Sequence, residues 1–487
     1  MRCLFVASEC YPLIKTGGLA DVVGALAPAL APLGCEARVL LPAYPAVQEE
    51  LKAAKQVARL PDLFGGAGRL VEGKTGDGLS VLALEAPHLF DRPGNPYLGK
   101  NGKDWPDNHL RFAALSWAAR EIALGSAGAW RPDLVHAHDW QAGLVPAYLR
   151  FSGQPHPPVI FTIHNLAFQG LFPKTLLKTL RLPPESFGFG GLEYWDKISC
   201  MKAALVYSDH ITTVSPTYAQ EIQTDEGGMG LGGVLRGRAD SVTGIVNGID
   251  EAVWDPASDP NIDAHYGMRS LTKKAADKRA LQERFALKRR RNVPLFCVVS
   301  RLTEQKGLDL LLEALPLILS RKAQLAVLGS GDAAIEKAYV QAAAQNPGQV
   351  GVVIGYDEPL SHRMQAGADT IIIPSRFEPC GLTQLYGLRY GTLPVVARVG
   401  GLADTVIDAN LAALRDRVAT GFLFAPVTAD ALRSALAHAC DLFQNRRLWR
   451  AVQRRAMAQD VGWAAPAEAY HDLYRTLLAR SGAAAAA

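Results

Sequence analysis

The feature that most constrains this chain is a repeated alternation between short, continuously apolar runs and longer segments of helical periodicity. In the first half the apolar runs are residues 4–7, 38–41, 134–137, 159–163, 211–214 and 242–246. Strands that are apolar on both faces are typical of a parallel sheet covered by helices on both sides. The segment 19–33 supports this interpretation, because its leucines and valines recur at helical spacing along one face.

The alternation pauses between about 250 and 292 and then starts again, with apolar runs at 295–299, 325–328, 350–354, 370–373 and 393–397. A chain of 487 residues is also too long for a single core. We therefore expect two doubly wound α/β domains, residues 1–250 and residues 251–456. The segment 446–480 is predicted to be helical, and the part from 457 to 487 is expected to cross back to the first domain.

Composition excludes several classes of function. A net charge of +4 with a pI near 8.6 is too weakly basic for a nucleic-acid-binding protein. The one dense basic run, Lys288 to Arg291, is interpreted as a solvated helix end or linker, with a polyanion contact as the alternative. Seven scattered cysteines without a CxxC pair, and no apolar run long enough for a signal peptide or membrane span, indicate a cytoplasmic protein with no membrane partner.

Ligands of parallel α/β sheets bind beyond the carboxyl ends of the strands, so the residues that follow each strand are the first candidates for a binding site. After the first strand come Glu9, Lys15, the Gly17-Gly18 pair and Asp21. A glycine pair that opens a helix lets backbone N–H groups approach an anion, and Lys15 would add a full charge. The alternative is an ordinary strand-to-helix turn with a solvated lysine.

Histidines follow two further strands of the first half. The strand 134–137 leads into His136, His138, Asp139 and Trp140, and the strand 159–163 leads into His164. The His-x-His spacing allows a metal site, but no further ligand at a fixed spacing accompanies it. Buried structural histidines and substrate contacts by Asp139 and Trp140 are the other interpretations.

In the second half, the strand 295–299 leads into Arg301 and Lys306 just before a helix. An arginine fork and a lysine point charge in such a loop suit a diphosphate. The strand 370–373 leads into Glu378, which could accept hydrogen bonds from sugar hydroxyls, and into the amides of residues 381–383, which could hold phosphate. Cys380 is not expected to be a nucleophile, since no histidine is close to it in sequence.

One motif favours a different cofactor. Residues 329–334, GSGDAA, follow the strand 325–328 and match the G-x-G-x-x-A dinucleotide fingerprint. The next strand carries no acid at its tip before Asp357, which lies farther on than a ribose-binding acid should. We interpret the motif as a tight turn near a nucleotide, with NAD binding as the alternative.

Taken together and in this order, the motifs resemble those of bacterial glycogen synthases and plant starch synthases. They are KTGGLADV at 15–22, HAHDW at 136–140, IHN at 163–165, VNGID at 246–250, SRLTEQKG at 300–307 and SRFEPCGLTQLYGLRYG at 375–391. The resemblance extends from Lys15 to the GGLADTV at 400–406 and so covers most of the chain.

The resemblance implies a GT-B fold, in which two Rossmann-like domains face each other across a deep interdomain cleft. It implies retaining transfer of glucose from ADP-glucose to the non-reducing-end 4-OH of an α-1,4-glucan such as glycogen, with release of ADP. No cofactor and no metal are implied, and the partners are the donor and the glucan rather than nucleic acid.

The same resemblance assigns roles to individual residues. The implied catalytic residues are His164, Arg301, Lys306 and Glu378. The implied substrate-binding residues are Lys15, Gly17, Gly18, Asp21, Asn247, Tyr356, Cys380, Gly381, Leu382 and Thr383, with Tyr356 against the adenine. Glu9, Tyr97, Asp139 and Trp140 are expected in the acceptor channel.

One position departs from the pattern of related retaining glycosyltransferases, which often carry a second glutamate eight residues after the first. That position is Tyr386 here, which puts the role of the second acid in doubt rather than the activity. Two rival functions are an enzyme of the same architecture that uses UDP-glucose or another acceptor, and a catalytically silent glucan-binding protein. The silent protein would be expected to have lost Arg301, Lys306 or Glu378, and all three are present.

Overall fold

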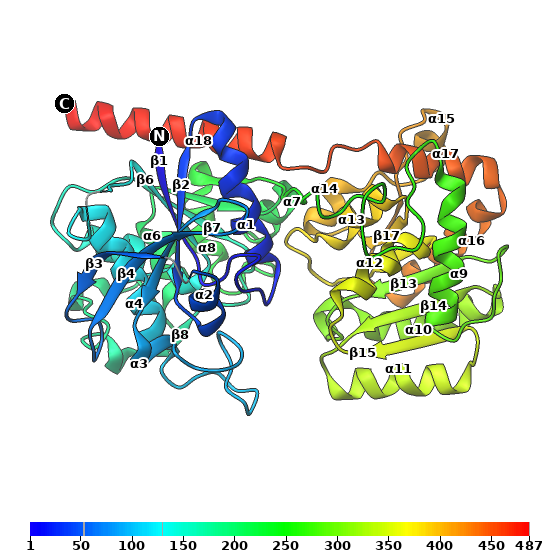
Figure 1. Cartoon of the computed structure of the whole chain (residues 1–487), viewed down its shortest axis with the longest axis horizontal. Helices are drawn as coiled ribbons and strands as arrows, with labels where there is room; N and C mark the ends of the chain where they lie inside the picture. The colour runs from blue at the N-terminus through cyan, green and yellow to red at the C-terminus, as the bar shows by residue number, and fades with distance from the viewer. Residues whose placement is uncertain (52–53, 129, 487) are drawn as a thin grey trace. The chain divides into compact units, whose positions relative to one another are not determined.

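The computed structural model describes residues 1–51, 54–128 and 130–486, which form two compact units (Figure 1). Unit 1 comprises Met1–Asn247 together with the C-terminal segment that begins at Trp463. Unit 2 comprises Gly248–Gly462. Every strand predicted from an apolar run is confirmed, and the ends differ from the prediction by at most two residues.

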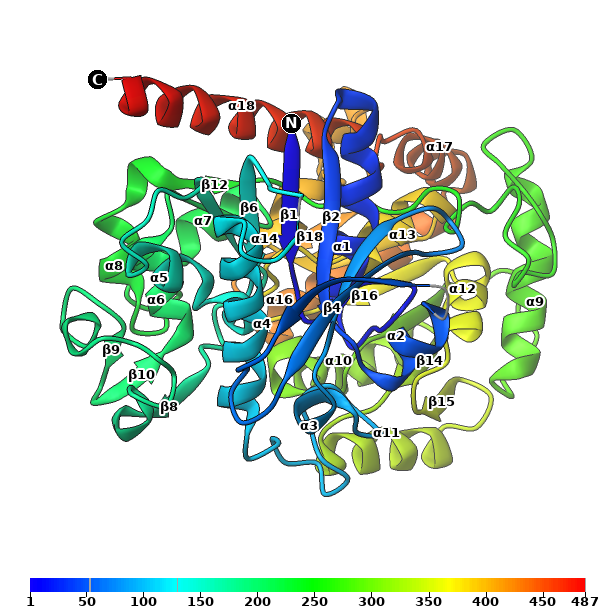
Figure 2. The same cartoon turned by 60° about the vertical axis from the view of Figure 1, so that its left-hand side comes forward.

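Unit 1 is built on a sheet whose described strands number nine. In spatial order they are β12 (Val242–Gly244), β11 (His210–Thr213), β7 (Val159–Ile163), β6 (Leu134–His138), β1 (Arg2–Val6), β2 (Glu36–Pro42), β5 (Ser80–Glu85), β4 (Gly68–Lys74) and β3 (Lys55–Leu60). The strands from β12 to β5 pair in parallel, and Figure 2 shows β1 and β2 side by side.

The predicted strands of this sheet pair in parallel, and the sheet continues beyond them at one edge, where β4 runs antiparallel to both β5 and β3. The sequence pattern did not identify these three strands. β3 and β4 mix charged with apolar residues because much of this edge is open to solvent, so neither forms the continuous apolar run of a strand buried on both faces. A small antiparallel sheet, β8 (Leu171–Pro173), β10 (Lys197–Ser199) and β9 (Glu193–Tyr194), was likewise not predicted.

Helices pack on the unit 1 sheet. The principal ones are α1 (Gly18–Leu30), α4 (Asn108–Leu124), α5 (Val145–Arg150), α6 (Cys200–Tyr207), α7 (Pro216–Glu221) and α18 (Ala464–Ala486), and the shorter ones are α2 (Pro45–Glu50), α3 (Pro87–Phe90) and α8 (Gly232–Arg236). α18 belongs to this unit although it is last in the chain (Figure 1). Its Tyr470 and Tyr474 are fully buried, and the Tyr474 hydroxyl lies 2.7 Å from Nδ1 of His136 on β6.

The predicted single helical segment 446–480 is two helices, α17 (Arg446–Met457) in unit 2 and α18 in unit 1. The residues between them carry the chain from one unit to the other. Within unit 2 the carbonyl of Val461 accepts a hydrogen bond from the Ile249 N–H at 2.8 Å, and residues 458–463 form turns and bends instead of helix. Periodicity could not locate this break, because it arises from the division into units.

Unit 2 contains a six-stranded sheet, among the described residues, whose pairs are all parallel. Its order is β15 (Val350–Ile354), β14 (Gln324–Gly329), β13 (Leu295–Val299), β16 (Thr370–Ile373), β17 (Leu393–Ala397) and β18 (Phe422–Phe424), of which only the three-residue β18 was not predicted. Residues alternate between two apolar clusters: Phe296 and Val298 lie in one, and Leu295 and Cys297 lie in the other. Both faces are therefore buried, as continuous apolar runs predict.

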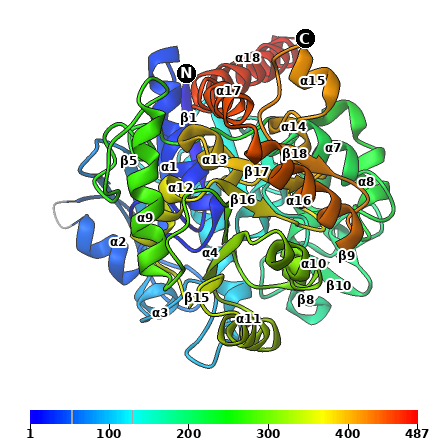
Figure 3. The same ribbon diagram turned by 90° about the vertical axis from the view of Figure 1, so that its right-hand side faces the viewer.

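The helices of unit 2 cover these two faces, with α9 and α12 on one side of the sheet and α10 and α16 on the other (Figure 3). They are α9 (Lys274–Arg284), α10 (Leu308–Ser320), α11 (Ala333–Gln345), α12 (Glu358–Gly367), α13 (Thr383–Tyr390), α14 (Gly400–Thr405), α15 (Leu411–Arg415) and α16 (Ala429–Gln444), followed by α17.

Candidate functional site

In unit 2 the strand order proceeds outward in opposite directions from the neighbouring strands β13 and β16. Such a reversal leaves a crevice outside the carboxyl ends of the two strands, where open α/β sheets bind ligands. The loop that follows β13 carries Arg301 and Lys306, and the loop that follows β16 carries Glu378. The topology therefore brings together residues about 75 positions apart in sequence, at the place where a ligand is expected.

Lys306 and Glu378 form an ion pair in this crevice. The lysine ammonium lies 2.5 Å from Oε2 of Glu378, and the Ser375 hydroxyl donates to the same oxygen at 2.8 Å. The two charged side chains are only 17% and 9% exposed, so the carboxylate is stabilised by these two donors rather than by water. Because an ammonium carries three N–H donors, Lys306 keeps donors for a second anion.

The backbone of the two loops is tied together at Gly307. This residue has φ +64°, and a Cβ there would lie 1.9 Å from the carbonyl oxygen of Pro374. Only glycine combines that left-handed conformation with so close an approach. The Arg376 N–H also donates to the carbonyl of Gln305 at 2.9 Å, so the loop bearing Lys306 and the loop bearing Glu378 are held in one register.

Further groups suited to an anion surround this pair. The Arg301 side chain is exposed, and its Nη2 donates to Oε1 of Gln305 at a long 3.3 Å. α13 begins at Thr383 without a side-chain cap, and no acceptor in the described part of the chain receives the N–H groups of Gly381, Leu382 and Thr383. Open N–H groups at the start of a helix bind phosphate oxygens. Cys380, just before them, is buried.

The GSGDAA turn lies beside the Arg301 loop. The Leu302 N–H donates to the carbonyl of Ser330 at 2.9 Å, and the Asp332 N–H donates to the carbonyl of Leu302 at 2.8 Å. Asp357, the acid nearest to the next strand, accepts the Leu360 N–H at 2.9 Å and caps α12. Its carboxylate is thus used within the fold, which weakens the NAD interpretation. Tyr356, at the end of β15, is 77% exposed.

In unit 1 the strand order reverses between β1 and β6, and Glu9 follows β1 at that point. Glu9 is 3% exposed and holds the loop before α1: it accepts hydrogen bonds from the Thr16 N–H, from the Thr16 hydroxyl at 2.6 Å and from the Gly17 N–H at 3.3 Å. The Tyr97 hydroxyl donates to Oε1 of Glu9, the oxygen that also accepts from the Thr16 hydroxyl. Glu9 and Tyr97, two of the four predicted acceptor-channel residues, are therefore in contact, and Glu9 also orders the glycine turn.

Lys15 and Asp21 were predicted separately as substrate contacts, and the structure pairs them. Nζ of Lys15 lies 2.8 Å from Oδ1 of Asp21, and both side chains are about a quarter exposed. The ammonium also lies 5.4 Å from the centre of the Tyr11 ring. The lysine is thus held next to Gly17 and Gly18 at the start of α1.

His138, Asp139 and His164 form one cluster at the ends of β6 and β7. Nδ1 of His138 lies 3.0 Å from Nε2 of His164, and Oδ1 of Asp139 accepts the His164 N–H at 2.8 Å. Burial lowers the pKa of His164 to about 3 and that of His138 far below its ordinary value, so both rings are neutral. Burial raises the pKa of Asp139 to about 7, although the backbone N–H groups that donate hydrogen bonds to its carboxylate act to lower it.

The tautomer of this pair follows from a buried atom. Nε2 of His138 is buried and has no hydrogen-bond partner in the described part of the chain. A buried N–H without an acceptor costs more than a bare lone pair, so the proton of His138 lies on Nδ1 and is donated to Nε2 of His164. His164 then carries its own proton on Nδ1 and can donate it to a ligand.

Two other predicted residues lie in unit 1. Asn247 is 6% exposed, and its Oδ1 is buried with no partner among the described residues, as expected for an oxygen that awaits a donor. Trp140 packs edge-on against Phe112, with ring centres 5.0 Å apart, and also contacts Phe172. Its placement is therefore set by aromatic packing.

Tyr386, the position where related enzymes carry a second glutamate, belongs to the core of unit 2. Its ring stacks on Trp254 at 3.7 Å, and Trp254 stacks in turn on His362 at 3.7 Å. Nδ1 of His362 lies 2.7 Å from Oδ2 of Asp259, which closes the cluster. A carboxylate at position 386 would lie within this aromatic stack, so packing explains why an aromatic residue occupies the position.

Across residues 1–51, 54–128 and 130–486, no three His, Cys, Asp or Glu side chains are grouped so that they could hold a metal ion. Within the same ranges, no helix has both the length and the apolar character needed to cross a bilayer.

The sequence prediction missed three contributors: Thr16, Ser375 and the positioning role of His138. Thr16 lies within the KTGG motif, and Ser375 lies three residues before Glu378, so proximity to a predicted residue was the available signal. Their roles depend on which way each side chain points, and sequence spacing in a loop does not determine that.

Comparison with known proteins adds independent findings. The starch synthase catalytic domain family matches residues 2–237, and the glycosyl transferases group 1 family matches residues 280–451. A glycogen synthase of Roseobacter denitrificans is 57% identical over 478 residues, which cover 98% of this chain and 100% of that protein. A protein of Bradyrhizobium diazoefficiens named glycogen synthase 2 is 55% identical over 477 residues, which cover 98% of each chain.

Solved structures agree with these matches. The catalytic domain of starch synthase IV from Arabidopsis thaliana, bound to ADP and acarbose, superimposes with a TM-score of 0.89 at 31% identity and covers 98% of this chain and 99% of that one. A sucrose-phosphate synthase from Thermosynechococcus elongatus matches with a TM-score of 0.61 at 19% identity over 98% of this chain and 99% of that one, which shows likeness of fold alone.

Proposed function

The chain belongs to the family of bacterial glycogen synthases and starch synthases, and from this premise we propose how its own residues perform the reaction. It is a glycosyltransferase with the GT-B fold that extends an α-1,4-glucan, glycogen, with glucose from ADP-glucose. The observation that carries the proposal is the meeting of Lys306, Glu378 and open helix amides at the switch point of unit 2.

We propose that Arg301 and Lys306 neutralise the departing ADP. Breaking a glycosyl phosphate bond builds negative charge on the leaving diphosphate, and preorganised cations stabilise that charge most in the transition state. Lys306 is held in place by Glu378 and retains donors for a phosphate, while Arg301 is exposed and bonded only weakly to Gln305. The amides of residues 381–383, with the backbone of Cys380 before them, would hold phosphate and glucose oxygens.

The donor glucose is proposed to lie against Glu378 and His164. A carboxylate that already accepts from Ser375 and Lys306 still has lone pairs for a sugar hydroxyl. His164, neutral and with its proton on Nδ1, is suited to donate to a hydroxyl oxygen rather than to repel the positive charge that develops on the sugar. Asn247 would direct its unpartnered Oδ1 to a sugar hydroxyl.

In the remaining assignments, the Lys15 loop, with Gly17, Gly18 and Asp21, contacts the donor, and Tyr356 lies against the adenine. The Tyr356 side chain is 77% exposed, its hydroxyl donates to Glu358, and an aromatic ring of this kind can stack on a base. For the acceptor channel, Trp140, Asp139 and Tyr97 stay candidates. Glu9 is better described as a positioning residue, because its carboxylate is occupied by Thr16, Gly17 and Tyr97.

We propose that configuration is retained by attack on the same face from which ADP leaves, with the departing phosphate accepting the proton of the glucan hydroxyl. Glu378 is bound by a lysine and a serine, so it is poorly disposed to act as a nucleophile. A covalent glucosyl adduct trapped on Glu378, or on any other residue, would contradict this part.

We also place the reaction in the cytoplasm, because all seven cysteines are free thiols, as in a reducing compartment.

The test measures release of ADP and of UDP from ADP-glucose and UDP-glucose, each with and without glycogen. We expect ADP release that depends on glycogen and that falls by at least about a hundredfold in Arg301→Ala. Arg415→Ala is the matched control, because this arginine of the same unit is 77% exposed and pairs only with its neighbour Asp416. Faster turnover of UDP-glucose would overturn the donor assignment, and no release from either donor would favour a silent glucan-binding protein.

A further inference from the structure

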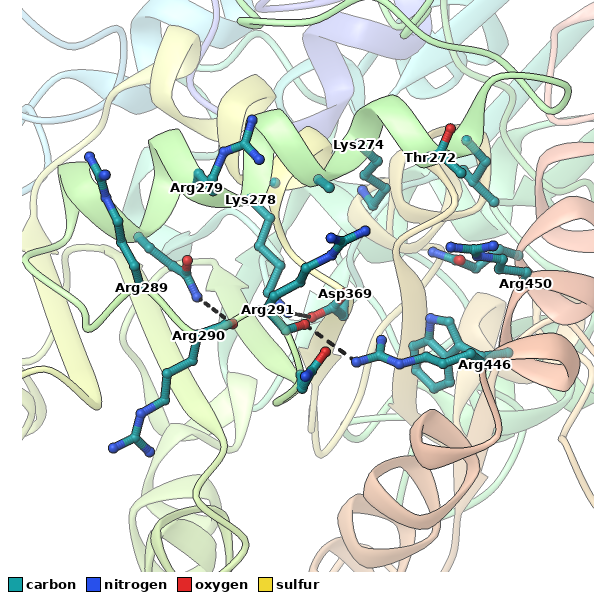
Figure 4. Close-up of a pocket in the computed structure, with 17 residues that line it drawn as sticks. Thr272, Lys274, Lys278, Arg279, Arg289, Arg290, Arg291, Asp369, Arg446 and Arg450 are labelled. Carbon is teal, nitrogen blue, oxygen red and sulfur yellow. Dashed lines mark hydrogen bonds and ion pairs between the residues drawn. The ribbon is translucent and has the colours of Figure 1, made fainter.

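Unit 2 contains a cavity of about 370 Å³ that the proposed reaction does not use (Figure 4). It is bounded by α9, the loop of residues 289–292 and α17. Seventeen residues line it, of which two are Lys and six are Arg, whereas one, Asp369, is acidic. The basic run that the sequence left open between solvated linker and polyanion contact therefore forms one wall of a strongly basic cavity.

The cavity lies at the amino ends of the unit 2 strands, and the candidate active site lies at their carboxyl ends. Asn292 comes shortly before the first residue of β13, and Asp369 comes directly before the first residue of β16. Arg301 and Glu378 follow the last residues of the same two parallel strands. A ligand in this cavity would thus contact the amino ends of the strands, whereas the donor is proposed to bind at their carboxyl ends.

The two lysines and the aspartate of the cavity are already occupied. Nζ of Lys278 lies 2.5 Å from Oδ2 of Asp369, which also accepts the Leu295 N–H at 2.8 Å. The Lys274 ammonium donates to the carbonyls of residues 365 and 366 and to the Thr392 hydroxyl, at 2.7–2.9 Å. These three side chains therefore bond neighbouring segments of the wall to one another.

Most of the arginines, by contrast, have no counter-charge. Arg289 pairs with Glu283 at 3.0 Å. The other five, Arg279, Arg290, Arg291, Arg446 and Arg450, form no ion pair with any described residue. Such a gathering of like charges repels itself and is relieved when an anion binds.

Arg446 is held in the orientation that an anion site requires. Its guanidinium stacks on the Phe443 ring at 3.7 Å and donates to the carbonyl of Arg291 at 3.3 Å. Burial lowers the pKa of Arg446, the carboxylate of Asp369 opposes this shift, and the charges of Arg450 and Arg291 lower the pKa further, so these three guanidinium groups are close enough to interact. Figure 4 shows Arg291, Arg446 and Arg450 around the part of the cavity near Asp369, while Arg290 extends away from them.

A buried donor without an acceptor also lies in the cavity wall. Trp449 is one of the lining residues and is 2% exposed, and its indole N–H has no hydrogen-bond partner among the described residues. Among the charged side chains of the wall, guanidinium groups without an ion pair outnumber the single carboxylate, so the complement of this wall is a group rich in acceptor oxygens.

We propose that this cavity binds a small anion carrying two or more adjacent phosphate groups, held chiefly by Arg291, Arg446 and Arg450. Arginine forks match phosphate oxygens in pairs, and a cavity of about 370 Å³ with several guanidinium groups that form no ion pair among the described residues has room and charge for more than one phosphate group. The net charge of the whole chain is only +4, so the basic character is local to this cavity rather than spread over a surface that could follow a nucleic acid.

The probe is inorganic tripolyphosphate, with its binding measured by titration calorimetry on the full chain carrying Arg301→Ala as a common background, which weakens the proposed donor site without adding ADP, a diphosphate that would compete for the cavity. We expect one saturable site, and the Arg291→Ala/Arg450→Ala variant should bind about tenfold more weakly or worse. The matched control is Arg284→Ala/Arg447→Ala, which removes two exposed arginines from α9 and α17 that do not line the cavity. Its affinity should equal that of the protein that carries Arg301→Ala alone.

Equal weakening in both double variants would overturn the proposal, because it would show attraction by general charge alone. Absence of saturable tripolyphosphate binding to the protein that carries Arg301→Ala alone would overturn it as well. A parallel titration with ATP separates two sources of the same chemistry: tighter binding than tripolyphosphate would indicate a nucleotide, and equal or weaker binding would indicate a bare phosphate chain. The substituted arginines are remote from the carboxyl ends of β13 and β16. Glycogen-dependent ADP release should therefore be unchanged in both double variants when they keep Arg301.

Discussion

Lys306 offers the sharpest test of the proposed site, because the structure gives it two separable roles. It neutralises Glu378 in the folded protein and is proposed to neutralise the leaving diphosphate during reaction. The perturbation is Lys306→Met, which keeps most of the length of the side chain and removes its charge. The two roles predict changes in two different measurements.

The first change is in rate. Removing one preorganised donor from a developing anionic charge lowers kcat by about 10²- to 10³-fold. The second is in stability: the 9% exposed Glu378 carboxylate is left with the Ser375 hydroxyl alone, and an underpaired buried charge lowers the free energy of unfolding by about 1–3 kcal/mol. Adding Glu378→Gln removes that charge, so the double variant should regain most of the stability and none of the rate.

The assays are glycogen-dependent ADP release at saturating ADP-glucose and urea unfolding of the same preparations. Lys337→Met, at an exposed position of α11, is the matched control and should change neither measurement. The reasoning would be refuted if Lys306→Met kept its rate within about threefold, which is too small for the loss of a preorganised donor. It would also be refuted if Glu378→Gln restored activity, since the lysine would then act only through its ion pair.

Three further predictions concern single positions. Tyr356→Ala should raise the KM for ADP-glucose about fivefold or more while kcat stays constant, because stacking on a base contributes about 1 kcal/mol or more; steady-state kinetics with both nucleotide sugars check this. Gly307→Ala should lower the free energy of unfolding by about 1–2 kcal/mol or more and reduce kcat, because its φ of +64° disfavours a Cβ and the Cβ would meet Pro374; a Gly267→Ala control, where a Cβ has open space, should do neither. Burial lowers the pKa of His136 to about 3, below its unfolded value of about 6.5, so the unfolded chain takes up the proton first and stability falls with pH; urea unfolding should show a loss between pH 7 and pH 5 that is about 2 kcal/mol smaller in His136→Gln.

Much of the fold could be predicted because buried parallel strands leave a strong local signature. A strand covered on both faces must be apolar at every position, and runs such as 295–299 and 159–163 show this directly. The strands that escaped prediction are those without that constraint: β3 is largely exposed at a sheet edge, and β18 has only three residues. The break between α17 and α18 escaped for another reason, since it reflects the passage of the chain from unit 2 to unit 1.

The candidate site divides in the same way. Which residues follow strands can be read from sequence, so the strand ends identify Arg301, Lys306, Glu378 and His164 as candidates. The partners of such residues cannot be read in the same way. The pairing of Lys15 with Asp21, the clasp of Glu9 on Thr16 and the hydrogen bond from His138 to His164 depend on loop conformation and on side-chain direction.

By itself, then, the sequence determined the doubly wound class, the position of each buried strand and the chemical groups at the strand ends, because these depend on local periodicity and residue type. Only the tertiary structure decided which groups meet. Strand order brings Lys306 within 2.5 Å of Glu378, 72 residues later, and assembles Arg291, Arg446 and Arg450 into one cavity from a loop and a distant helix. Contacts of that range are set by how whole elements pack, and no local pattern encodes them.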